Sequence, residues 1–152
     1  MALSHGRKLY FSVASPSTGV VTSTDLSAYT KEVNGLPGEQ DLADVTVAGN
    51  VGHTSFPGLQ KASFSSVHMF DDGTSASWTT LANWQTTQTT YTSTGWTVSF
   101  GPRGNSTGFP KITCLALIKQ ITMPIRVTDP NTFTVNWEMS AGTVGITATT
   151  WA

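Results

Sequence analysis

The chain has 152 residues, a length typical of one domain and enough to bury roughly two thirds of its unfolded surface. Only 11% of the residues are Asp, Glu, Lys or Arg, and the formal net charge is −1. The eight basic residues are scattered and form no stripe with exposed aromatic residues, which argues against a protein that grips nucleic acid. More than a quarter of the chain is Thr or Ser. Such a surface suits a protein covered by its neighbours, and it also suits a simple Thr-rich β-domain.

Cysteine usage and the N-terminus bear on the compartment. Cys114 is the sole cysteine, so no intrachain disulfide is possible, and its place within an apolar strand predicts a buried thiol rather than a nucleophile. The opening residues, MALSHGRKLYF, lack the apolar core of a signal peptide, and no stretch approaches the roughly 20 apolar residues of a membrane helix. We therefore expect synthesis in a reducing cytoplasm and no membrane insertion by this chain.

The first half of the chain reads as a series of strands. They are expected at Lys8–Ala14, Val20–Leu26, Glu39–Val47 and Ala62–Phe70. Between the third and the fourth lies the Gly-rich stretch GNVGHTSFPG, which is too long for a tight hairpin and holds no nucleophile, metal cluster or phosphate cradle. It predicts a long loop.

One segment departs from the β pattern. In GTSASWTTLANWQTT, apolar residues recur at helical spacing after the breaker pair Asp72 and Gly73, with Thr74 as the expected N-cap. This predicts one helix over Ser75–Gln85. Its Thr-rich composition is a weak helix former, so packing of Trp78 and Leu81 on the sheet should hold it in place.

The second half alternates apolar and polar residues, which is typical of half-buried antiparallel strands. In GWTVSFG and NTFTVNWEM, the apolar faces consist of Trp96, Val98 and Phe100, and of Phe133, Val135, Trp137 and Met139. These two strands should contribute to the core.

Three further features complete this half. KITCLALIKQI, Lys111–Ile121, is apolar on both faces at its centre and should be covered on both sides. Pro130 and Asn131 mark a turn within a hairpin of about Pro124–Met139, and a last strand is expected at Thr143–Thr149. The fold class is therefore mainly β: one domain over residues 1–152, an antiparallel β-sandwich or barrel with one flanking helix.

The search for chemistry finds no constellation. His5, His53 and His68 are not at metal-ligand spacing, and HMFDDGTS lacks the alternating oxygen ligands of a calcium loop. GPRGNSTG has no lysine and no helical pattern behind it, so it predicts a hairpin loop rather than a phosphate loop. We expect no catalytic residue, no metal and no cofactor, and a protein that is not an enzyme.

Five tryptophans raise the alternative of a carbohydrate-binding sandwich. Trp78, Trp96 and Trp137 fall on apolar faces, which favours the core for these three. Trp84 and Trp151 are open to either interpretation.

A resemblance to a known family rests on the order of several segments. DLSAYTKEVNGL, EQDLADVTVAGN and SFPGLQKASFSSVHMFDD precede the expected helix, and GWTVSFG and ITMPIRVTDPNTFTVNWEMSAGTVGI follow it. This order, from about Asp25 to Ile146, resembles the tail tube proteins, or major tail proteins, of long-tailed bacteriophages. The closest parts are Asp25–Tyr29, the Thr46–Leu59 stretch with its Phe-Pro-Gly, and the final strand pair.

The resemblance implies a structural virion protein. Its β-sandwich would assemble as stacked, hexameric rings around a lumen, the conduit for genome ejection, with N-terminal and C-terminal arms that take part in assembly. Its partners would be other copies of itself, a tape measure protein, and tail tip and tail terminator proteins. Double-stranded DNA would pass through transiently and without specificity. The protein would be located in the phage tail after assembly in the cytoplasm of the bacterial host.

The resemblance also suggests roles for particular residues. The long loop would contact the adjacent ring, although a mobile surface loop is the alternative, and its candidate contacts are Val51, His53, Phe56, Pro57 and Leu59. The lumen would be lined by polar strand faces, because strand side chains alternate between faces. The lumen candidates are Thr132, Thr134, Asn136 and Glu138, together with Glu39 and Asp41, or Gln40 and Asp44 in the other register. Glu138 on an outer, solvated face is the alternative for that residue.

Two other classes stay open at this point. One is another virion β-protein, such as a capsid decoration or tail-completion protein. The other is a carbohydrate-binding sandwich or a small β-enzyme. Rings or tubes seen by electron microscopy would separate the tail tube from both.

Overall fold

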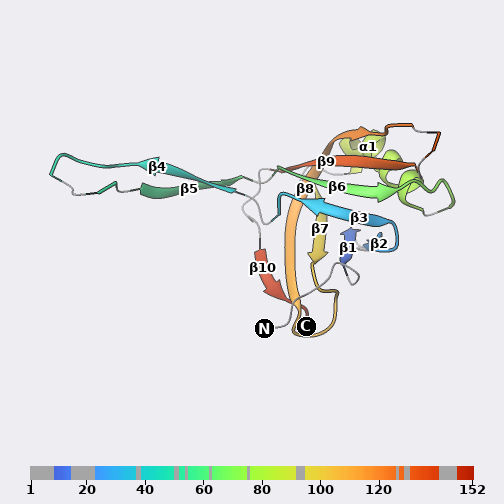
Figure 1. Ribbon diagram of the computed structural model, residues 1–152, viewed down its shortest axis with the longest axis horizontal. Coiled ribbons are helices and arrows are strands. Elements are labelled where there is room, and N and C mark those ends of the chain that lie inside the picture. The colour runs from blue at the N-terminus through green and yellow to red at the C-terminus, as the bar shows by residue number, and fades with distance from the viewer. Residues whose placement is uncertain are drawn as a thin grey trace.

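The computed structural model describes residues 9–14, 23–36, 39–49, 52–53, 55–61, 63–74, 76–91, 95–125, 127–128, 131–140 and 147–152. Figure 1 shows a β-rich body with one helix packed on it and a long two-stranded arm that projects from one side. The arm consists of β4 (Glu39–Asp44) and β5 (Ser55–Lys61).

Within the described residues, the body is one antiparallel sheet of eight strands. Its order is β2-β1-β7-β8-β9-β6-β3, and β10 pairs with β8 off this path. The strands are β1 (Tyr10–Ala14), β2 (Ser23–Asp25), β3 (Thr30–Asn34), β6 (Ser63–Met69), β7 (Trp96–Gly101), β8 (Pro110–Thr122), β9 (Thr132–Met139) and β10 (Thr147–Thr150).

The long strand β8 joins two halves of this sheet. Its first part pairs with β7 and β10, and its second part pairs with β9. A register shift between Ile118 and Gln120 bends the strand, because an extra residue opposite a ladder increases the local twist. The two halves pack face to face: the ring of Phe11 on β1 lies 5.5 Å from that of His68 on β6 and 6.4 Å from that of Trp137 on β9. The mainly β sandwich expected from the sequence is confirmed.

The core lies between these halves. Trp96, Trp137, Phe11 and Phe133 are its largest fully buried side chains, and each such side chain stabilises the fold by roughly 1.5–3 kcal/mol. On β9 burial alternates strictly from Thr132 to Trp137, as the sequence predicted. The apolar faces therefore determine which side of each strand turns inward.

The helix α1 spans Ser77–Tyr91, so it begins later and ends later than expected. Ala76, not Thr74, takes the N-cap position, because its carbonyl accepts the bond from the N–H of Thr80. The carbonyl of Asp71 accepts from the N–H of Trp78, which satisfies a free helical donor without a side-chain cap. The expected N-cap at Thr74 is thus wrong.

The extension of α1 beyond Gln85 has a tertiary cause. The side-chain amide of Gln88 donates from Nε2 to the carbonyl of Ile118 at 2.9 Å, and its Oε1 accepts from the Ile118 N–H at 3.1 Å. These two bonds fill a gap in the ladder where β8 bends. A polar residue in a Thr-rich stretch therefore ties the last turns of α1 to the sheet.

Several strand boundaries differ from expectation. β4 is shorter than Glu39–Val47, β2 ends at Asp25 rather than Leu26, and β3 and β5 were not expected at all. Residues 20–22 of the expected Val20–Leu26 strand lie outside the described residues. The hairpin expected at Pro124–Met139 is wrong in its first strand: β9 pairs with β8, which ends at Thr122. Pro124 has no N–H for a ladder, and it lies outside any strand. Of the two expected turn residues, Pro130 lies outside the described residues, and the carbonyl of Asn131 accepts from the N–H of Phe70.

β8 itself is covered less evenly than expected. Cys114, Ala116 and Ile118 are buried on one face, whereas Leu115 and Leu117 on the other face are half-buried. The expectation of full cover on both faces is therefore wrong for the single chain.

Candidate assembly surfaces

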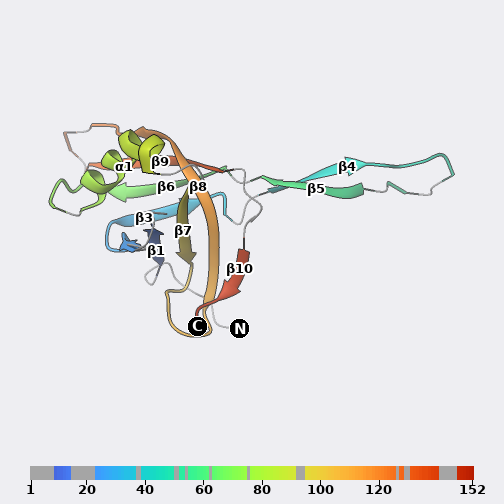
Figure 2. The ribbon, with the colours of Figure 1, turned by 180° about the vertical axis from the view of Figure 1, so that it is seen from behind.

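The arm is the part of the chain most separate from the core. It continues from the β3 and β6 edge of the sheet and extends far beyond the body, as both ribbon views show (Figures 1 and 2). Its strands pair antiparallel, with Leu42 opposite Pro57 and Ala43 opposite Phe56. Within the described residues β4 and β5 pair only with each other. A long hairpin replaces the loop that the sequence predicted.

Both faces of the arm carry exposed apolar side chains. Leu42 and Pro57 share one face, and Phe56 lies on the other, because neighbouring strand residues point to opposite sides. Leu42 is 68% exposed and Phe56 62%. A two-stranded hairpin is at best marginally stable by itself in water. Exposed apolar groups on such an element indicate a surface that is covered in an assembly.

The end of the arm is held by a carboxylate. Asp44 Oδ1 accepts from the N–H of Thr46 at 2.9 Å and from the Thr46 hydroxyl, and His53 Nδ1 lies 3.5 Å from Asp44 Oδ2. The hydrogen bonds from Thr46, first that of its side chain, lower the pKa of Asp44. Gly49 turns the chain with φ +103°, a conformation that favours glycine. Asp44 is therefore a fixed negative charge near the tip.

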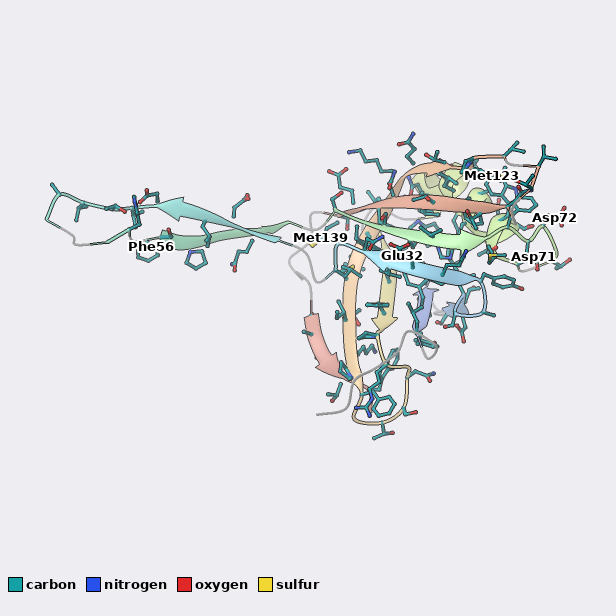
Figure 3. All side chains as sticks on the ribbon, viewed as in Figure 1. Glu32, Phe56, Asp71, Asp72, Met123 and Met139 are labelled. Atoms are coloured by element: carbon teal, nitrogen blue, oxygen red, sulfur yellow. The ribbon has the colours of Figure 1, made fainter. Side chains whose placement is uncertain are left out.

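The expected inter-ring residues distribute along this arm. Phe56, Pro57 and Leu59 lie in β5, and His53 lies exposed near the tip. Val51 lies outside the described residues. Figure 3 shows Phe56 far out on the arm, opposite in the molecule to Asp71, Asp72 and Met123.

The polar face of β9 belongs to a larger polar surface, here called the outer face. Thr134 is opposite Val67, Asn136 opposite Ser65, and Glu138 opposite Ser63, and residues paired in this way point to the same side of a sheet. Thr132 is opposite Met69 on this face, and Gln120 and Thr122 of β8 continue it on the other side of β9. A depression of about 490 Å³ opens there beside Asn34, Ser65, Gln120 and Asn136.

The only ion pair found on the outer face among the described residues joins Lys119 Nζ to Glu138 Oε2 at 3.2 Å. Both side chains are more than half exposed. The lumen candidates of β9 thus lie together on this face. Glu39 and Asp41 do not join them, because they lie in β4 on the arm.

A second charged surface lies where β7, β8 and the last residues meet, and we call it the cationic end. It consists of Tyr10, Arg103, Phe109, Lys111 and Trp151. The guanidinium of Arg103 lies 4.6 Å from the ring centroid of Phe109, and Lys111 Nζ lies 4.4 Å from that of Trp151. The Tyr10 ring meets Trp151 edge-on at 5.0 Å.

Backbone bonds fix the cationic end. The carbonyl of Trp151 accepts from Gly108, and its N–H donates to Phe109, so the loop between β7 and β8 holds the end of the chain. GPRGNSTG is therefore a hairpin loop, as predicted. Of the two expected terminal arms, residues 1–8 lie outside the described residues, and β10 pairs with β8.

A buried polar chain connects the core strands. The Thr30 hydroxyl donates to the Leu26 carbonyl at 2.8 Å, so its oxygen accepts from His68 Nδ1 at 3.0 Å. His68 Nε2 then accepts from the Ser66 hydroxyl at 2.7 Å, whose oxygen accepts from Trp137 Nε1 at 2.9 Å. Burial lowers the pKa of His68 to about 4. His68 is a neutral structural residue with one assigned tautomer.

Reactive chemistry finds little support among the described residues. Burial raises the pKa of the Cys114 thiol to about 11, so the buried thiol predicted from the sequence is confirmed. No group of three His, Cys, Asp or Glu side chains is close enough to hold a metal in this part of the chain. Nor does any helix described here have the length and apolarity to span a membrane.

The tryptophans left open by the sequence also pack internally. Trp84 stacks on Trp96, and Trp151 contacts Tyr10 and Lys111. Trp78 packs against Phe70 and Phe133, while Leu81 beside it on α1 is fully buried. No tryptophan in the described residues forms the exposed platform that stacks on a sugar.

Comparison with known proteins identifies the fold. No protein-family model matches the chain, and no curated protein sequence matches it. Solved structures do resemble it. The sheath/tube terminator of an extracellular contractile injection system, PVC, superposes with a TM-score of 0.68 over 98% of each chain, at 11% identity.

Two further structures are similar over most of their length. The tail of an empty gene transfer agent particle, refined with C6 symmetry, has a TM-score of 0.62 at 13% identity, covering 99% of this chain and 100% of that one. The SPP1 tail tube has a TM-score of 0.60 at 10% identity, covering 97% of this chain and 80% of that one. The chain therefore has the fold of tail tube and tube terminator proteins, and the resemblance seen in the sequence is confirmed at that level.

Proposed function

We propose that this chain is the subunit of a phage tail tube, and that its copies assemble as stacked hexameric rings around a lumen through which the genome leaves the virion. The observation that carries the proposal is the arm: a hairpin with exposed apolar residues on both faces, on a body with the tail tube fold. The C6 symmetry of the similar gene transfer agent tail supports six subunits in a ring.

Lateral contacts would use an open sheet edge. Among the described residues β3 pairs on one side only, with β6. An unpaired edge offers a row of N–H and C=O groups to another strand. If the half-sheet β8-β9-β6-β3 continued from one subunit to the next, the sheets would close into a ring without free edges. Each subunit would then turn one face of this half-sheet toward the lumen.

The outer face is the proposed lumen wall. It presents Thr134, Asn136 and Ser65, the ion pair of Lys119 with Glu138, and the exposed acid Glu32 of β3, which is opposite Val67. DNA phosphates bind clustered cations strongly, and the affinity depends on salt. A wall of hydroxyl and amide groups, one ion pair and one further acid offers no such cluster of cations, so double-stranded DNA passes through transiently and without sequence specificity.

Axial contacts would use the arm. Leu42, Val47 and Phe56 extend beyond the body, where an adjacent ring can cover them. The remaining partners follow from a tube with two ends: a tape measure protein inside it during assembly, and tail tip and terminator proteins at its ends. In this proposal the protein acts in the virion, without catalysis, after assembly in the cytoplasm of the host.

Electron microscopy of the purified protein tests the proposal. We expect rings or tubes of roughly 100 Å diameter, the size of six domains of this length around a pore. A protein that stays monomeric at all concentrations and salt conditions would exclude the tube and favour a capsid decoration protein or another β-domain.

A tube terminator is the second candidate, because the terminator of the contractile injection system superposes with a TM-score of 0.68. A terminator closes a tube and does not propagate it. Single rings that never stack, and that bind one end of a tube formed by a second protein, would favour this candidate.

A further inference from the structure

Two surfaces of this chain carry charge of opposite sign. The described segments that form the cationic end, residues 9–14, 95–118 and 147–152, contain Arg103 and Lys111 and no acidic residue. The arm has the opposite balance: residues 39–61 contain three acids, Glu39, Asp41 and Asp44, and one base, Lys61. With only 11% charged residues in the chain, this separation defines two surfaces of opposite sign.

The two cations of the cationic end are positioned to bind a carboxylate. Arg103 and Lys111 each lie over an aromatic ring, and neither forms an ion pair with an acidic side chain in the described part of the chain. A ring beneath a cation restricts its position and leaves its charge uncompensated. Both side chains are only half-exposed, so a carboxylate bound there would be partly shielded from salt.

The carboxylates of the arm cannot reach this end within one molecule. Asp41 and Asp44 are exposed on β4, and the arm points away from the body in a different direction from the loop between β7 and β8 (Figures 1 and 2). The complementary surface must therefore belong to another molecule. Asp41 shares its face of the arm with Phe56, whereas Asp44 lies on the opposite face with Leu42. Phe109 and Trp151 lie among the cations, so the face of Asp41 and Phe56 matches the cationic end in its apolar groups as well.

We propose that the arm of one copy docks on the cationic end of a second copy, with Asp41 facing Arg103 and Lys111. The inference rests on the proposed function and adds the surface that receives the arm. Such a contact joins two different patches and does not close on itself, so it propagates copies in one direction. Opposite charges also set the register and exclude arm-to-arm contacts, which would place like charges together.

Charge reversal with rescue tests the proposal. Asp41→Lys alone, and Arg103→Glu with Lys111→Glu, should each raise the concentration at which tubes form by roughly tenfold or more. Asp41→Lys combined with Arg103→Glu and Lys111→Glu should restore most of the assembly, because the attraction is re-formed with the signs exchanged. Asp72→Lys, an exposed charge far from the arm in Figure 3, is the matched control and should assemble like the unaltered protein.

A zero-length cross-link gives a direct readout. Carbodiimide treatment of tubes made from a mixture of ¹⁴N and ¹⁵N protein should join Lys111 to Asp41, in peptides of mixed isotope composition that show two different copies. Circular dichroism and thermal unfolding establish that each variant is folded. Tubes of the unaltered protein together with a combined variant no better than its parents, and no cross-link at Lys111, would overturn this inference alone. Failure of the unaltered protein to form any high-mass species would overturn the proposed function with it.

Discussion

The indole rings of Trp84 on α1 and Trp96 on β7 stack with centroids 4.7 Å apart and planes 15° from parallel. Trp96 is almost fully buried, whereas Trp84 is half-buried and closes the core from the helix side. This pair, together with the fully buried Leu81, holds a Thr-rich helix that has little intrinsic stability of its own.

Leu81→Ala should therefore destabilise the domain by roughly 3 kcal/mol, since a fully buried leucine is lost and a cavity replaces it. Urea unfolding measures the change. Thr79→Ala on the exposed side of α1 is the control: it removes one exposed hydrogen bond, from the Thr79 hydroxyl to the Asp72 carbonyl, and should shift the free energy of unfolding by about 1 kcal/mol or less. Equal unfolding midpoints for the two variants would contradict the packing of α1 on the sheet.

Gln88→Ala should destabilise β8 at its bend near Ile118. It leaves the N–H and C=O of the buried Ile118 without partners, at a cost of about 1–3 kcal/mol. Hydrogen exchange of the Ile118 amide should accelerate more than that of Val135 in the core of β9. Gln88→Glu keeps the acceptor and loses the donor, so its effect should lie between those of alanine and glutamine.

Stability should fall in acid because of His68. Its pKa is about 4 in the folded state against an ordinary value of 6.5, so the unfolded chain binds a proton between these values and the folded chain does not. Stability is thus fully present above pH 6.5 and decreases as pH falls toward 4, by on the order of 3 kcal/mol. His68→Gln, which does not titrate, should show a flatter dependence of unfolding free energy on pH over this range. A parallel dependence in both proteins would assign the acid effect to other groups.

Phe56→Ser should separate folding from assembly. The side chain is 62% exposed and lies on the arm, so the melting temperature should change little. Loss of an apolar contact should abolish tubes or raise the concentration they require. Sedimentation and circular dichroism measure the two properties. Normal tubes from both Phe56→Ser and Leu42→Ser would mean that the arm is not an assembly element.

Glu138→Lys should leave tubes intact but impede genome delivery. The change replaces a compensated pair with two adjacent positive charges, the native Lys119 and the introduced lysine, in each subunit of a ring against passing phosphates. Higher salt should relieve the defect. Lys119→Glu combined with Glu138→Lys keeps the pair and is the matched control, so phage with both changes should deliver DNA normally. Normal infection by the single variant, with the mutant protein confirmed in the tails, would place Glu138 away from the lumen.

The local rules of sequence explain which parts of this fold were foreseen. Alternation along β9 predicted its buried face, because Phe133, Val135 and Trp137 must share one side of a strand. The Trp and Leu spacing predicted a helix, but not its length, since the bond of Gln88 to Ile118 joins residues 30 apart in the chain. No local pattern records such a partner.

The arm was foreseen only in part. GNVGHTSFPG suggested a loop, because Pro57 and Gly58 are poor strand residues in a domain that buries its own sheets. In a projecting hairpin, the outer edge of β5 needs no backbone N–H, which is the group that proline lacks. β5 therefore tolerates Pro57 and Gly58. β3, with Lys31, Glu32 and Asn34, escaped notice for the same reason: an edge strand with few apolar residues does not show a core face.

β8 belongs to both halves of the sheet, and this determines how the domain unfolds under mechanical force. β8 pairs with β7 and β10 at one end and with β9 at the other. One half of the sheet therefore cannot unfold without breaking pairs of the strand that also belongs to the other half. The residues at the bend, around Ile118, are held by both the ladder and α1. Unfolding should therefore be cooperative across the whole body, and the slowest-exchanging amides of the two halves should report one common free energy. In a particle whose wall is made of such subunits, each subunit should unfold as a whole under force and should not lose its structure gradually.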